Sequence, residues 1–149
     1  MSTACDCLPV KIESATKART TFQLAGDAAE SLAAEYLITR GWQVLARKVR
    51  VGREELDLVA VDRGPPPAVV FVEVRWRRNR DFGLPEETFD HRKRRHVWSA
   101  AMRVIAVGTL PGGVRLPLLP VRLDLIVVEP PLRPDQAPRL RHHRNVSLD

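Results

Sequence analysis

Two apolar segments joined by a short turn limit what this chain can fold into. Residues 55–62 and 68–76 are rich in valine and leucine, and neighbouring positions along each segment are apolar. Strands of this kind are covered on both faces of a sheet, because successive side chains point to opposite sides. The sequence Arg-Gly-Pro-Pro-Pro at 63–67 is typical of a turn. The sequence therefore predicts an antiparallel hairpin of central strands.

Segments on either side of the hairpin complete an α/β pattern. Residues 21–40 carry apolar side chains at three- and four-residue steps, which indicates a helix. Residues 42–51 and 121–128 are predicted strands, and a second helix is expected to run from an N-cap at Thr88 to about residue 107. The predicted fold class is α/β, a mixed β-sheet flanked by helices in the order α-β-β-β-α-β.

The length and composition favour one domain with irregular ends. The chain has 149 residues, which is enough to bury a single core. Residues 1–20 lack periodicity and are expected to form a flexible arm, and 21–129 form the domain. Residues 130–149 are rich in proline and arginine, so an irregular basic tail is expected there.

Charge and hydropathy narrow the classes of function. The formal net charge of +6 favours anionic partners such as nucleic acid. No apolar run approaches the roughly 20 residues that a membrane-spanning helix needs, and the first residues carry no continuous apolar stretch of a secretory signal. The sequence therefore predicts a cytoplasmic protein with no membrane partner.

The sharpest feature is an acid inside each of the two most apolar segments. If the turn spans 63–67, residues whose numbers sum to about 130 face each other in the hairpin, and Asp57 and Glu73 satisfy that sum. Their Cβ atoms are then about 5 Å apart, so a positive charge must bridge the two carboxylates if both are ionised. A divalent cation such as Mg²⁺ is one solution. A structural network with Arg75, which shares a strand face with Glu73, is the other.

A third acid stands on the first predicted helix. Glu30 lies beside Ala29 and Ala33, next to the apolar stripe, and these small neighbours allow the helix to approach the sheet closely. Glu30 is therefore a candidate to join Asp57 and Glu73, and an ordinary glutamate at the boundary of the core is the alternative.

The order of these motifs resembles a known family. The chain contains GDAAE at 26–30, ELDLVAVD at 55–62, VFVEVRWR at 70–77 and VRLDLIVV at 121–128. This order is similar to that of the YraN family, small bacterial proteins regarded as predicted endonucleases related to archaeal Holliday-junction resolvases. That family resembles the restriction-endonuclease fold with its PD-(D/E)xK motif, so the resemblance implies a restriction-endonuclease-like sheet here.

The resemblance also implies roles for individual residues. Asp57 and Glu73 match the two acids of the motif and would bind a metal ion, Mg²⁺ or alternatively Mn²⁺, with Glu30 completing the site. The implied reaction is metal-assisted hydrolysis of a phosphodiester bond. The lysine of the motif is Arg75 here, which offers charge and hydrogen bonds but stays protonated. Glu55 matches a family acid of less defined role.

Smaller departures and matches accompany these roles. Lys48 stands where the family usually has asparagine, and Lys93 matches a lysine of the family.

Basic residues cluster around the predicted acids. Clustered arginine and lysine can contact a nucleic-acid backbone without reading its sequence, and a solvated charged face is the alternative. The residues expected to bind nucleic acid are Arg50, Arg77, Arg78, Arg92 and Lys93.

Three classes of function remain open. The leading hypothesis is a Mg²⁺-dependent endonuclease with Glu30, Asp57, Glu73 and Arg75 as its catalytic residues, acting on DNA, with branched DNA as one candidate substrate. The alternative is a non-catalytic nucleic-acid-binding module on a degenerate nuclease fold, as the arginine in place of lysine suggests. A third is a protein-interaction domain whose acids form only salt bridges. A two-fold DNA junction would suit a homodimer, although no residue pattern requires one.

Overall fold

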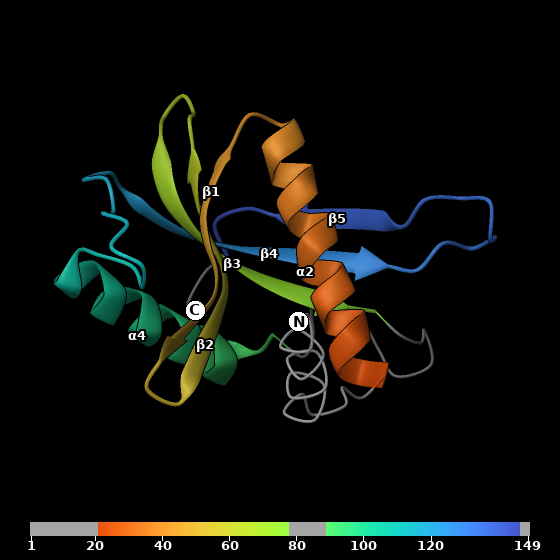
Figure 1. Cartoon of the computed structure of the whole chain (residues 1–149), viewed down its shortest axis with the longest axis horizontal. Helices are drawn as coiled ribbons and strands as arrows, with labels where there is room; N and C mark the ends of the chain where they lie inside the picture. Colours follow the sequence, from red (N-terminus) through yellow and green to blue (C-terminus); the bar gives the residue numbers. More distant parts are fainter. Residues whose placement is uncertain (1–20, 78–88, 147–149) are drawn as a thin grey trace, which may run out of the picture.

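The computed structural model describes residues 21–77 and 89–146, with the side chains of 21–24 excepted. The predicted arm at 1–20 and the predicted N-cap Thr88 lie outside this range. The elements in chain order are α2 (Thr21–Thr39), β1 (Gln43–Val51), β2 (Glu54–Asp62), β3 (Ala68–Trp76), α4 (His91–Val107), β4 (Val121–Glu129) and β5 (Arg139–His143) (Figure 1).

The strands form one mixed sheet in the order β1-β2-β3-β4-β5. Neighbouring strands are antiparallel except for β3 and β4, which are parallel because α4 carries the chain back between them. The predicted mixed α/β fold is confirmed. The structure adds one strand, β5, after the last element that the sequence predicted.

That additional strand corrects the prediction of an irregular tail. Residues 139–143 form β5 and pair with β4, with Leu125 opposite His143 and Glu129 opposite Arg139. Only Leu140 is apolar in this strand, and it packs against the buried cluster beneath α2. The pattern of apolar residues was therefore too weak to predict this strand from the sequence. Backbone pairing with the edge of β4 holds residues 139–143 in the strand conformation.

The two helices cover opposite faces of the sheet. Ala29, Ala33 and Leu37 of α2 pack with Leu58 and other residues of one sheet face. The helix α4 packs on the other face, in a cluster that contains Phe71. Figure 1 shows α2 and α4 on separate sides of the strands. None of the helices that the structure describes is long and apolar enough to cross a membrane.

The second helix begins later than the sequence predicted. Asp90 is its N-cap, and its carboxylate accepts a hydrogen bond of 3.0 Å from the backbone N–H of Lys93. An aspartate and a threonine are both good N-caps, so sequence alone did not choose between neighbouring candidates. The helix ends at Val107, as expected, and Gly108 follows in a left-handed conformation with φ 82°.

The predicted register of the central hairpin is confirmed. Leu58 pairs with Val72 and Val61 with Val69, so paired residue numbers sum to 130. Gly64 in the turn has φ 73°, and a Cβ there would lie 2.2 Å from the carbonyl carbon of Pro66. Only glycine fits this position, because any side chain would collide with the following backbone.

A network of ionic hydrogen bonds joins β4 to the end of β5. Asp124 is fully buried and accepts hydrogen bonds of 2.8 and 3.0 Å from Arg122. The ring Nε2 of His142 lies 2.8 Å from the same carboxylate, and the N–H of Asn145 donates to it at 2.9 Å. Burial alone would raise the pKa of Asp124, but these hydrogen bonds outweigh burial and lower the pKa below its ordinary value.

Replacing Asp124 by asparagine should destabilise the protein strongly. The change removes the buried charge that compensates partly buried Arg122, and breaking such a pair costs about 3–5 kcal/mol of unfolding free energy at neutral pH. Because the pKa of Asp124 is lowered by folding, this contribution is lost as the pH falls through the folded value.

Urea unfolding at several pH values measures the effect, and exposed Asp135 offers a matched control. Asp135→Asn should change the unfolding free energy by less than about 0.5 kcal/mol. Equal effects of the two substitutions would contradict a stabilising role for the network.

Candidate functional site

The central hairpin opens at the position of Asp57. The ladder between β2 and β3 ends at Leu58 and Val72, although β3 continues beside β4 as far as Trp76. In place of the next backbone pair, the N–H of Val74 donates a hydrogen bond of 2.8 Å to Asp57 Oδ2. A side-chain carboxylate therefore occupies the place where the two strands separate.

The side-chain alternation of β2 is interrupted at the same residue. Leu58 packs on the α2 side of the sheet and Val59 on the α4 side, as a regular strand requires. Leu56 should then share a side with Leu58, but it belongs to the α4 side. Strand β2 is therefore irregular around Asp57. Irregularities of this kind change the direction of a side chain near a functional site.

A lysine faces Asp57 from the neighbouring strand. In the register of β1 and β2, Arg47 pairs with Leu58 and Val49 with Leu56, so Lys48 lies opposite Asp57. Lys48 has φ 50°, and its Nζ lies 2.9 Å from Glu30 Oε2.

Lys48 also bonds to Asp27. It therefore ties β1 to two acids of α2.

Four acids gather around this position. One carboxylate oxygen from each of Glu30, Glu55 and Asp57 lies within 4.8 Å of the others. Asp57 and Glu73 are close enough for each to influence the pKa of the other. The structure thus brings together the three acids singled out in the sequence, Glu30, Asp57 and Glu73, and adds Glu55. We call these four residues the acidic cluster.

Burial and mutual repulsion raise the pKa of three cluster residues. The pKa of Asp57 rises from 3.8 to about 7, first because of burial and then because of Glu73. The pKa of Glu73 is also raised, since burial outweighs the attraction of Arg75 and Lys93. Burial raises the pKa of Glu30 despite its contact with Lys48.

These shifts mark a shortage of positive charge. Asp124 in the same sheet is fully compensated and has a lowered pKa, whereas Lys48 and Arg75 compensate the acidic cluster only in part. Carboxylate oxygens are the ligands that Mg²⁺ and Mn²⁺ prefer, and a divalent cation would supply the missing charge. The donor set of Glu30, Glu55 and Asp57 therefore fits such an ion.

Arg75 contacts the cluster from β3. Its Nε lies 3.3 Å from Glu73 Oε1, which agrees with the prediction that the two residues share a strand face. The guanidinium also lies 5.9 Å from the ring centroid of Phe89. Among the described residues, Nε of Arg75 is buried and has no hydrogen-bond acceptor. Arg75 therefore places a positive charge beside the acids, and its buried Nε meets Glu73 without a well-aligned hydrogen bond.

The predicted nucleic-acid contacts divide into separate groups. Lys93 Nζ lies 3.9 Å from Glu54 Oε2, and Arg92 and Arg50 are exposed. Arg77 instead forms an ion pair of 3.1 Å with Glu129 at the end of β4, so its charge is already paired. Arg78 lies outside the described residues.

A surface cavity lies on α4, and Arg92 is part of its lining. It has a volume of about 680 Å³ and is lined by Arg92, Arg95, His96, Trp98 and Ser99. This lining would suit a nucleic-acid strand, because arginine can contact the phosphates and an indole can stack on the bases.

Two residues of the site were not assigned a clear role from the sequence. The place of Lys48 opposite Asp57 follows from the register of β1 and β2, which the sequence did not give because a bulge between Val44 and Ala46 shifts it. The position of Glu55 as a metal ligand could not be found from the sequence. Regular alternation places Glu55 and Asp57 on the same side of the strand, but it does not tell how close α2 brings Glu30 to them.

Comparisons with known proteins agree with each other. The model of the uncharacterised protein family UPF0102 matches residues 29–128, a range that contains the whole acidic cluster. The chain is 39% identical to a UPF0102 protein of Roseiflexus castenholzii over 72% of this chain and 81% of the relative. It is 39% identical to one of Symbiobacterium thermophilum over 70% and 81%. A Pseudomonas putida relative is 47% identical over 52% of this chain and 60% of its own length.

The metal-free protein should lose stability as the pH rises towards about 7. Folding raises the pKa of Asp57 from 3.8, so between these values the folded chain holds a proton that the unfolded chain has released. Asp57→Asn keeps an acceptor for the N–H of Val74 and removes the charge. The variant should therefore exceed the wild type in stability above neutral pH, by on the order of 1–3 kcal/mol.

Urea unfolding in EDTA across this pH range measures the difference. The control is Asp124→Asn, for which the opposite sign is expected. An Asp57→Asn variant that is less stable than the wild type above neutral pH would show that the aspartate is compensated by the fold.

Proposed function

This chain belongs to the uncharacterised protein family UPF0102, and from that premise we propose that it is a metal-dependent endonuclease that hydrolyses phosphodiester bonds of DNA. The resemblance to the YraN family noted in the sequence is confirmed by this membership. The observation that carries the proposal is the convergence of acids from α2, β2 and β3 with too little positive charge to compensate them.

Asp57, Glu30 and Glu55 are the residues that would bind the metal ion, and Glu73 stands beside them. When bound, Mg²⁺ or Mn²⁺ lowers the pKa of an attacking water and stabilises negative charge on the phosphate. The raised carboxyl pKa values support this assignment, because they reflect buried and crowded negative charge that a bound cation would neutralise.

Arg75 and Lys48 supply the positive charge of the site. Arg75 stays protonated beside the acids and would stabilise the charge that develops on the phosphoryl oxygens. Lys48 lies 2.9 Å from Glu30 and favours the ionised form of that acid. Exposed Arg92 and Arg50, with half-buried Lys93, would contact the DNA backbone and orient the strand without reading its sequence.

A second candidate function rests on the same two residues. Arginine cannot take a proton from water, and Lys48 already pairs with Asp27 and Glu30. Both observations favour a nucleic-acid-binding module that has lost its catalytic activity. The branched substrate and the homodimer remain part of the nuclease proposal, because a two-fold junction has two equivalent strands to cut.

Purified protein should cleave DNA in Mg²⁺ or Mn²⁺ and lose the activity in EDTA. Asp57→Asn and Glu73→Gln should each lower the rate by about 100-fold or more, because each removes charge from the metal site. Gel assays on linear and four-way-junction DNA measure the rate, with Asp135→Asn as the control that keeps full activity.

Cleavage that survives Asp57→Asn would remove the acidic cluster from the reaction. Binding of DNA with no cleavage in either metal would establish the second candidate function. Faster cleavage of the junction than of linear DNA would support the branched substrate.

Arg75→Lys should increase the cleavage rate. A lysine amine can release its proton and activate the water, whereas the guanidinium of Arg75 stays protonated. The expected gain is about tenfold in kcat, measured under saturating metal ion. Arg75→Gln serves as the comparison and should lower the rate. A loss of activity in both variants would show that the site depends on the fork of donors that only arginine offers.

A further inference from the structure

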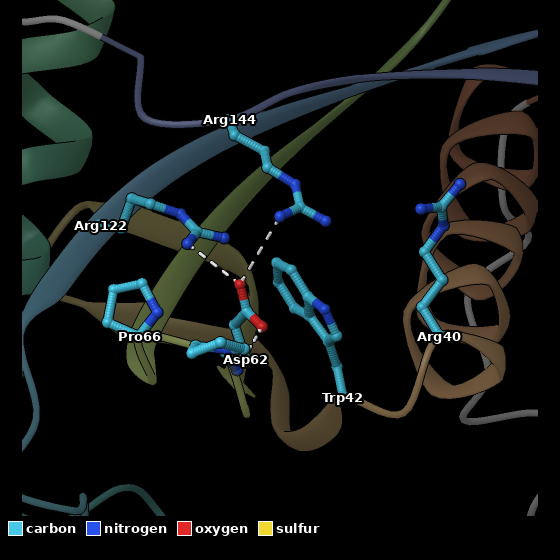
Figure 2. Close-up of a pocket in the computed structure, with 8 residues that line it drawn as sticks. Arg40, Trp42, Asp62, Pro66, Arg122 and Arg144 are labelled. Atoms are coloured by element: carbon cyan, nitrogen blue, oxygen red, sulfur yellow. Dashed lines mark hydrogen bonds and ion pairs between the residues drawn. The ribbon is translucent and has the colours of Figure 1, made fainter.

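A second polar cavity lies at the opposite end of the sheet from the acidic cluster. Its volume is about 390 Å³. Its lining includes Arg40 after α2, Trp42 before β1, Asp62 at the end of β2 with the turn that follows, Arg122 near the start of β4, and Arg144 after β5. Figure 2 shows the three arginines, which approach this space from different elements. We call it the arginine pocket.

One arginine of the pocket is held firmly in place. Arg122 donates to both oxygens of Asp124, and its Nη1 lies 3.0 Å from Asp62 Oδ2. Asp62 in turn accepts a hydrogen bond of 2.9 Å from the N–H of Gly64 in the turn. The one carboxylate that lines the pocket is thus already satisfied by Arg122 and by the turn.

The positive charges of the other two arginines, Arg40 and Arg144, are less fully neutralised by carboxylates. Among the described residues, Arg40 forms no ion pair, and its guanidinium lies 4.6 Å from the ring centroid of Tyr36. Arg144 lies 3.9 Å from Asp62 Oδ2, and half of its side chain is exposed. Asp62 and Asp124 neutralise Arg122, so Arg40 and Arg144 give the pocket its excess of positive charge.

Buried Trp42 keeps these groups in position. The guanidinium carbon of Arg122 lies 5.3 Å from the indole centroid, and that of Arg144 lies 5.6 Å from it. Cation–π contacts of this kind orient an arginine and leave its N–H groups free to donate. The pocket is therefore preorganised for an acceptor-rich anion.

The number and geometry of the donors favour a phosphate. Arginine forks bind oxyanions through pairs of N–H groups, and several forks from different directions match a tetrahedral group better than a planar carboxylate. The volume of about 390 Å³ falls within the usual range for small-ligand sites, about 300–1,000 Å³. The cavity can thus hold a phosphate together with the group that carries it.

The pocket is separate from the acidic cluster. Arg40 lies about 15 Å from Glu30 along the axis of α2, at the helical rise of about 1.5 Å per residue. Asp62 lies about 16 Å along β2 from Asp57, at about 3.3 Å per residue. Binding at one end of the sheet therefore leaves the other end open.

We propose that the arginine pocket binds a phosphate group through Arg40 and Arg144, beside the Arg122 guanidinium that Asp62 and Asp124 hold in place. The sources that share this chemistry are inorganic phosphate, a mononucleotide and the 5′-phosphorylated end of a nucleic-acid strand. The site takes no ligand from the acidic cluster, so it does not depend on the nuclease proposal.

Isothermal titration calorimetry in EDTA tests the proposal with four probes. These are inorganic phosphate, adenosine 5′-monophosphate, and one short single-stranded oligonucleotide with either a 5′-phosphate or a 5′-hydroxyl. At least one phosphorylated probe should bind with a Kd below about 1 mM, the weak end of specific small-ligand binding. The oligonucleotide pair separates an end phosphate from the backbone, which both members share.

Arg40→Gln and Arg144→Gln should each weaken that binding by about tenfold or more, as the loss of a hydrogen bond to a charged group predicts. The matched control is Arg133→Gln, which removes the same charge from an exposed residue outside the pocket. Since Arg40 forms no ion pair among the described residues, its variant should keep the thermal stability of the wild type.

Several outcomes would overturn the proposal. One is the absence of binding by all phosphorylated probes, and another is binding that the Arg40 and Arg144 variants leave unchanged. Equal losses in Arg133→Gln would reduce the effect to net charge. Asp57→Asn should bind the probes as the wild type does, so failure of the pocket and failure of the nuclease site remain distinguishable.

Discussion

The hydrogen bond from the N–H of Val74 to the Asp57 carboxylate connects the fold to its candidate site. Up to Leu58 and Val72 the central hairpin is an ordinary antiparallel ladder, buried on both faces. Beyond that pair β3 stays with β4 and β2 stays with β1, so an acceptor must replace the lost strand partner. A carboxylate does so, and the acid is thereby fixed where helix α2 can bring Glu30 to it.

Two carboxylates of one sheet illustrate what burial demands of a charge. Asp124 receives hydrogen bonds from a guanidinium, an imidazole and a backbone N–H, and its pKa falls. Asp57 receives one backbone N–H and faces Glu73, and its pKa rises. The first arrangement ties strands together, whereas the second leaves a need for positive charge that a bound cation would meet.

The charges of this protein are sorted by position along the sheet. One end gathers acids from α2, β2 and β3, with Arg75 beside them. The other end gathers Arg40, Arg122 and Arg144 around buried Trp42. The net charge of +6 therefore describes neither end, because each is defined by side chains that the fold brings together from distant segments.

Local patterns in the sequence determined the helices, the central hairpin and its register, because a turn with three prolines and two apolar segments permit few pairings. They also placed Glu73 and Arg75 on one strand face. Only the tertiary structure decided on β5, whose single apolar residue gives no pattern until the edge of β4 pairs with it. It likewise decided the places of Lys48, Glu55 and the arginine pocket, since contacts between distant segments depend on packing rather than on periodicity.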